Sequence, residues 1–110
     1  MNLEYLEEVT AGDIDFKKEL IDIFLKQVPE FISNMQKFFD VNDLENLAKE
    51  AHTAKSSALI FGLEETGAAL KNIQRLAEAK KAEQINGLLS TVSLDLKNAT
   101  VSLSELAKKM

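Results

Sequence analysis

Apolar residues recur every three or four positions along most of this chain, the spacing that places them on one face of an α-helix. One segment, which begins at Phe16, carries them at Leu20, Ile23, Phe24, Phe31, Met35 and Phe38. The next carries them at Leu44, Leu47, Ala51, Ala54, Ala58 and Phe61. The last carries them at Leu88, Leu89, Val92, Leu96, Ala99, Leu103 and Leu106. One proline and four glycines are too few for an all-β chain with frequent turns, so the pattern predicts an all-α protein.

Capping and turn residues divide the pattern into five helices, at about residues 3–9, 16–40, 43–61, 63–80 and 82–108. Asp13 or Asp15 is expected to cap the second helix, and Asp43 the third, by accepting backbone N–H bonds. Pro29 lacks an N–H and crowds the preceding turn, so we expect it to kink or split the second helix. Gly62 stands where a left-handed C-cap should end the third helix. Four long helices joined by short turns predict an antiparallel up-down four-helix bundle with a short extra N-terminal helix.

The length of 110 residues suits one domain, spanning residues 1–110. An apolar share of 45% is enough to form a core, and the lack of cysteine excludes disulfides and thiolate metal sites. A net charge of -5 without a basic patch argues against nucleic-acid binding. We expect no membrane interaction and a cytoplasmic location, because neither a secretory signal nor a long apolar run is present. Met1 and the lack of a linker at either end favour a free-standing protein.

Few stretches of the chain could carry chemistry. A glycine-rich phosphate loop followed by Lys and Ser or Thr is missing, which disfavours nucleotide hydrolysis. A single histidine without cysteines excludes the usual two-histidine metal helices, and the Glu-x-x-His pattern of bundle di-metal sites does not occur. Glu64 and Glu65 are explained by a helix start, where the helix dipole favours acidic residues. The remaining candidate is residues 51–58, which contain the only histidine, His52.

His52 lies outside the apolar face of its predicted helix. At about 100° per residue it stands roughly 130° from the centre of that face, so it should point toward solvent or a shallow groove. Its position on the helix alone does not distinguish a functional histidine from an ordinary surface histidine. Lys55 and Ser56 follow at i+3 and i+4, within one turn of the imidazole. A neutral imidazole is a good nucleophile, the ammonium of Lys55 would offset phosphoryl charge, and the small Ser56 and Ser57 leave room for a partner.

The stretch His52-Thr53-Ala54-Lys55-Ser56-Ser57-Ala58 resembles the H-x-x-K-[GS]-S-[SA] signature of histidine-containing phosphotransfer (HPt) domains. Gly62 falls at the glycine that closes the active helix in that family. The resemblance continues into the helix that holds Leu70, Ile73 and Gln74, and backward to residues 15–25. It spans nearly the whole chain. One departure is Ser56, where the family often has glycine, and we expect it to alter rate or partner choice without loss of function.

This resemblance implies a phosphorelay intermediate without kinase activity of its own. His52 would accept a phosphoryl group from a receiver-domain aspartate and pass it to another receiver, with Lys55 as its electrostatic partner. Gln74, on the neighbouring helix, would be a hydrogen-bond donor to the site. The partners would be response-regulator receiver domains and a hybrid sensor histidine kinase. The receiver would supply Mg²⁺, so no cofactor is expected on this chain, which we expect to be a monomer.

The family also docks receivers on an apolar patch from its first helix and the start of its second. The matching residues here are Leu6, Val9, Phe16 and Leu20, for which ordinary core packing is an equally good interpretation. Two other functions stay open. An adaptor could dock a receiver or kinase without phosphotransfer, and a purely structural bundle could dimerise through an apolar seam. An independent enzyme fits least, because no base is paired with a nucleophile.

Overall fold

The structure, a computed structural model, covers all 110 residues and contains helices but no strand. The elements are α1 (Glu4–Thr10), α2 (Ile14–Asp40), α3 (Leu44–Ile60), α4 (Glu64–Glu78), the 3₁₀ turn η1 (Ala82–Gln84) and α5 (Ile85–Lys108). Each predicted helix is present with ends within two residues of the expected ones, except that α5 begins at Ile85 because residues 82–84 form the 3₁₀ turn, and the all-α prediction is confirmed. None of these helices combines the length with the apolar character that crossing a bilayer requires.

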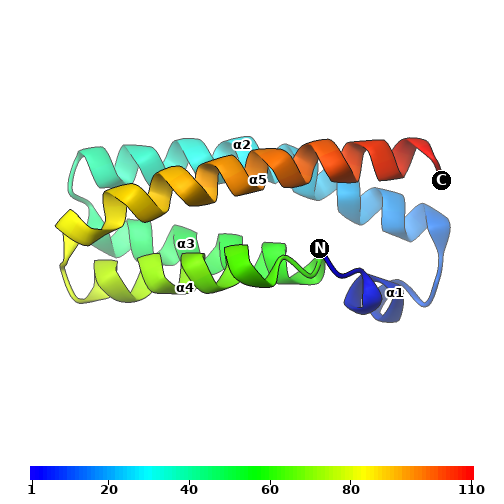
Figure 1. The fold of residues 1–110 in the computed structure, drawn as a ribbon, viewed down its shortest axis with the longest axis horizontal. Coiled ribbons are helices and arrows are strands. Elements are labelled where there is room, and N and C mark those ends of the chain that lie inside the picture. The colour runs from blue at the N-terminus through cyan, green and yellow to red at the C-terminus, as the bar shows by residue number, and fades with distance from the viewer.

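The four long helices form an antiparallel up-down bundle of 42 × 20 × 18 Å, as predicted (Figure 1). In this view α2 and α5 lie above α3 and α4, and each helix runs opposite to the one before it. The short helix α1 lies beyond the right-hand end of α3 and α4, under the first part of α2 and close to the turn that joins α3 and α4. Between them the helices enclose one continuous cluster of 21 buried apolar residues, so a single core supports the entire bundle.

The predicted caps set where α2 and α3 begin and where α3 ends. The Oδ1 of Asp13 accepts the backbone N–H of Phe16 at 3.0 Å, and the Oδ1 of Asp43 accepts that of Asn46 at 3.2 Å. Gly62 has a φ of 66°, a left-handed conformation that costs glycine little because it lacks a Cβ. These local signals explain why the sequence alone located the ends of the third helix.

The predicted apolar faces of α3 and α5 are confirmed, but that of α2 needs correction. Ile23 was expected in the core and is 45% exposed, whereas Ile21 and Val28 are fully buried. Apolar residues are dense between positions 20 and 25, so a period of 3.6 residues fits two neighbouring faces of the helix there. Contacts with the other helices decide between the two faces.

Pro29 does not split α2, which continues through it as one helix of 27 residues. Its ring lies on the exposed side, between Val28 and Phe31, which are both buried in the core. Anchoring on either side of the proline holds the helix together despite the lost N–H. The helix does change direction: in Figure 1 its blue N-terminal part slopes away from the line of its cyan part.

The turn at Gly62 also holds the N-terminal segment in place. The backbone N–H of Asn2 donates to the carbonyl oxygen of Gly62 at 3.4 Å, and the Asn2 backbone occupies the space that a Cβ at position 62 would need. An ion pair between Glu7 and Lys17 joins α1 to α2. The short helix α1 is therefore attached both to α2 and to the end of α3.

We expect Gly62→Ala to lower the free energy of unfolding by about 1–2 kcal/mol, because a Cβ disfavours the left-handed conformation. It should also raise amide exchange in residues 2–10, since the Asn2 backbone must move away. Urea unfolding and hydrogen exchange measure the two effects. Gly87→Ala is the matched control: Gly87 has open space around it inside α5, so alanine should stabilise the helix there by roughly 0.5–1 kcal/mol. Equal stability of the two variants would contradict the assigned role of Gly62.

Candidate functional site

His52 lies on α3 with its side chain exposed, outside the buried face of the helix. That face consists of Leu47, Ala48, Ala51, Ala54 and Ala58. The position predicted from helical periodicity is therefore confirmed. Four of the five buried residues are alanines, which keep α3 close to its neighbours and leave the imidazole standing at the rim of the interface between α3 and α4.

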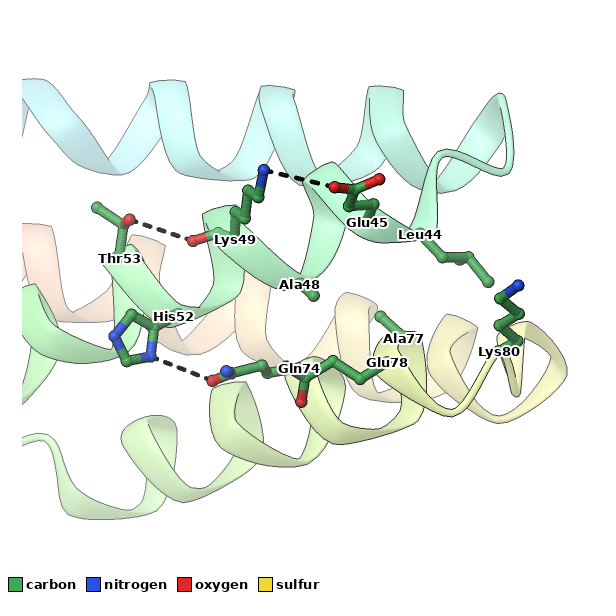
Figure 2. A pocket seen from close by; sticks show the side chains of 10 residues that line it. All are labelled: Leu44, Glu45, Ala48, Lys49, His52, Thr53, Gln74, Ala77, Glu78 and Lys80. Carbon is green, nitrogen blue, oxygen red and sulfur yellow. Dashed lines mark hydrogen bonds and ion pairs between the residues drawn. The ribbon is translucent and has the colours of Figure 1, made fainter.

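One ring nitrogen of His52 is held by Gln74 of α4. Nδ1 lies 3.3 Å from the Oε1 of Gln74, and the two side chains point toward each other across the helix pair (Figure 2). A carbonyl oxygen can only accept, so in this arrangement Nδ1 carries the hydrogen and donates it. Nε2 makes no hydrogen bond within the protein, and in the neutral ring with hydrogen on Nδ1 it has a free lone pair. The sequence resemblance implied Gln74 as a donor, whereas the structure has its carbonyl oxygen accepting.

Lys55 and Ser56 stand one turn from His52 on the same helix. Lys55 is half-buried and belongs to neither of the two ion pairs of the chain, which are Glu7–Lys17 and Glu45–Lys49. The hydroxyl of Ser56 donates to the backbone carbonyl of His52 at 3.2 Å, a common bond for serine inside a helix. Ser56 is thus directed to the backbone, and Lys55 is a cation beside the imidazole without a carboxylate partner.

A groove of about 680 Å³ begins at His52 and runs between the first half of α3 and the last turns of α4 (Figure 2). Its lining residues are Leu44, Glu45, Ala48, Lys49, His52, Thr53, Gln74, Ala77, Glu78 and Lys80. Lys49 is paired with Glu45 at 3.6 Å, so charge on this side of His52 is already partly neutralised. His52 therefore lies between a groove in which Lys49 has an acidic partner and a side of α3 on which the charge of Lys55 has none.

The predicted docking patch needs correction. Leu6 is 1% exposed and belongs to the core, because α1 turns this residue inward against the bundle, so it offers no surface to a partner. Leu20 is half-buried and packs against the same core. Val9 and Phe16 are exposed, at 41% and 42%. Two of the four residues thus lie on the surface.

Sequence reasoning missed four other exposed apolar residues on α1, α2 and α3: Tyr5, Ile14, Ile23 and Leu59. The exposure of Leu59 could have been predicted from the sequence, because this residue follows His52 by seven positions and so lies two turns along the same side of α3. Tyr5 lies one turn before Val9 on α1 and lines a shallow hollow with Leu59. The exposed apolar surface thus continues from α1 onto the helix that carries the histidine.

Comparison with known proteins agrees with this arrangement. Neither a curated protein nor a solved structure matches the chain. The protein-family model of the Hpt domain matches residues 19–107. Hpt domains are phosphocarrier modules of histidine phosphotransfer in phosphorelay signalling. This range includes the exposed histidine, its glutamine partner, the whole of α3 and α4 and most of α2 and α5. Because the match covers most of its length, the chain belongs to the Hpt domain family.

Proposed function

We propose that this chain is a phosphorelay intermediate that carries a phosphoryl group on Nε2 of His52 between the aspartates of receiver domains. The observation that carries the proposal is the state of the imidazole: exposed, bound at Nδ1 by Gln74 and free at Nε2. A neutral imidazole with one nitrogen hydrogen-bonded presents the other as a nucleophile. Family membership supplies the reaction class, and the geometry at His52 supports the assignment of the residue.

In the proposed step the lone pair of Nε2 attacks the phosphorus of a receiver's aspartyl phosphate. A P–N bond forms and the P–O bond to the aspartate breaks, so that the carboxylate leaves with the bonding electron pair. No proton has to leave the imidazole, because Nδ1–H remains bonded to Oε1 of Gln74. The ring then carries positive charge next to the phosphoryl group, and attack by a second receiver's aspartate reverses the step.

Lys55 supports this chemistry through its charge. A phosphoryl group brings close to two negative charges to His52, and an unpaired ammonium one turn away stabilises them. Ser56 contributes by its small size, because its hydroxyl is bonded to the backbone and leaves the approach to Nε2 open. Neither residue needs to move a proton.

We further propose that the chain acts as one Hpt domain and a monomer, with the receiver docking beside His52 on α1, α2 and α3. The exposed side chains of Val9, Phe16, Tyr5 and Leu59 would form the contact. Large apolar and aromatic residues at a surface favour protein association because their burial removes apolar area from water. Response-regulator receivers and a hybrid sensor histidine kinase are the proposed partners.

The test is incubation of the protein with a ³²P-labelled receiver phosphate and Mg²⁺, followed by analysis of the label. We expect transfer of the label to this chain as an acid-labile, base-stable phosphate, the stability expected of a P–N bond. Detectable binding of several receivers without transfer would instead support an adaptor. Absence of both transfer and binding would contradict the proposal altogether.

We expect Gln74→Ala to slow transfer about threefold to tenfold, since the neutral ring then loses the bond that fixes its tautomer. Transfer kinetics measure the rate, and ¹⁵N NMR of the imidazole reports which nitrogen carries the hydrogen. The matched control is Asn72→Ala, which removes an exposed amide from the same helix. A ring that keeps hydrogen on Nδ1 in Gln74→Ala would show that another group sets the tautomer.

A further inference from the structure

The alignment of α3 with α4 brings a second lysine into position beside His52. Two contacts fix the alignment of these antiparallel helices: His52 bonds to Gln74, and Leu59 lies over Gly67, its Cδ2 2.7 Å from where a Cβ would stand. In both pairs the two residue numbers add up to the same total, as they must when antiparallel helices have equal rise. Lys55 and Lys71 share that total, so they lie at the same level along the helix pair.

Lys71 lies on the flank of α4 that faces α3. It stands four residues after Gly67 and three before Gln74, the spacing that places the three side by side on one helix surface. Lys71 is displaced from Gln74 by about 4.5 Å along the axis of α4. Because the helices are antiparallel, this displacement has the same direction as the displacement of about 4.5 Å from His52 to Lys55. Packed helices are about 8–10 Å apart, and lysine has a long flexible side chain. Both ammonium groups can therefore reach a group bound to Nε2.

Charge supports the same assignment. Lys71 is exposed and, like Lys55, belongs to neither ion pair of the chain. Two unpaired cations at the same level of neighbouring helices repel, and a group with nearly two negative charges between them would relieve that repulsion. The other side of His52 is different: Lys49 is paired with Glu45, and Glu78 and Lys80 add one charge of each sign to the groove. The charges that line the groove therefore balance, whereas Lys55 and Lys71 are two cations without a carboxylate partner.

From this juxtaposition we infer that Lys71 is a second cation for the phosphoryl group on His52, acting together with Lys55 from the opposite helix. The inference rests on the proposed function, since it concerns the phosphorylated state of His52. It makes the binding site for the phosphoryl group a product of two helices, with the histidine and one lysine on α3 and the glutamine and the other lysine on α4.

The experiment compares Lys71→Met with Lys97→Met, a control that removes the same charge from an exposed lysine on α5. The measured quantity is the equilibrium constant for transfer between a phosphorylated receiver and His52. This constant depends on the stability of the free phosphorylated proteins, so a role of Lys71 in receiver docking alone would leave it unchanged. We expect it to fall about threefold to tenfold in Lys71→Met and to stay unchanged in Lys97→Met.

Two further readings complete the test. Lys71→Arg should restore the equilibrium constant because it keeps the charge, and the deficit of Lys71→Met should shrink when salt is raised from about 0.05 to 0.5 M. If the protein is phosphorylated normally and the equilibrium constants of Lys71→Met and Lys97→Met are equal, the inference is overturned while the proposed function stands. If no variant, including the unmodified protein, accepts a phosphoryl group, the proposed function itself fails.

Discussion

His52→Gln should abolish phosphoryl acceptance while the free energy of unfolding changes by no more than about 0.5 kcal/mol. The chain has no other histidine, so loss of Nε2 removes the only imidazole nucleophile. The stability should persist because His52 is exposed and makes one side-chain hydrogen bond, at 3.3 Å, to Gln74. Incubation with labelled receiver phosphate measures acceptance, and urea unfolding followed by circular dichroism measures stability.

Thr91→Gln provides the control for this experiment. It places the same side chain at an exposed position of α5, away from the imidazole, and should leave both acceptance and stability nearly as they are. Label that still enters His52→Gln as an acid-labile phosphate would exclude His52 as the acceptor. A loss of more than 2 kcal/mol of stability would show that the imidazole supports the bundle after all.

The helices and the position of His52 could be predicted because they depend on information local to the chain. Asp43 and Gly62 mark the ends of α3 by hydrogen bonding and by backbone conformation, which neighbouring residues largely determine. Between these ends, the fixed angle of about 100° per residue places His52 relative to the apolar face. The same reasoning holds for α5, whose apolar face is a single continuous stripe.

The docking patch could not be predicted because it depends on how a short helix rests on the bundle. The seven residues of α1 and the residue before it include Leu3, Tyr5, Leu6 and Val9, which point in several directions. Periodicity over two turns cannot tell which of them face inward. The decision comes from long-range contacts, such as the hydrogen bond between Asn2 and Gly62 and the packing of Leu6 in the core, while Tyr5 stays exposed.

The role of Lys71 was also beyond sequence reasoning, for a related reason. Periodicity fixes which side of α4 a residue occupies, but not which residue of α3 it faces. Leu59 sets this alignment by packing against Gly67, where the absence of a Cβ allows the two helices to approach closely. A larger residue at position 67 would shift α4 against α3 and move Gln74 away from the imidazole.

The largest loss of stability should follow from Phe24→Ala. Phe24 of α2 is 1% exposed, and its ring centroid lies 4.7 Å from that of Phe61, the C-cap of α3. Its removal forfeits buried apolar area and leaves a cavity, at a cost of about 3–5 kcal/mol. This is a large share of the roughly 5–15 kcal/mol that stabilises a typical domain. Urea unfolding and calorimetry measure the loss, which should lower Tm by roughly 12 °C or more.

Ile23→Ala is the matched control, since Ile23 precedes Phe24 on α2 but is 45% exposed, and its truncation should cost less than about 1 kcal/mol. Equal losses in the two variants would mean that α2 presents a different face to the core. At a temperature where Phe24→Ala remains folded, it should still accept a phosphoryl group, because His52, Gln74 and their helix pair are unchanged. Together with His52→Gln, which loses the chemistry and keeps the fold, this result would separate the residues that hold the bundle from those that react.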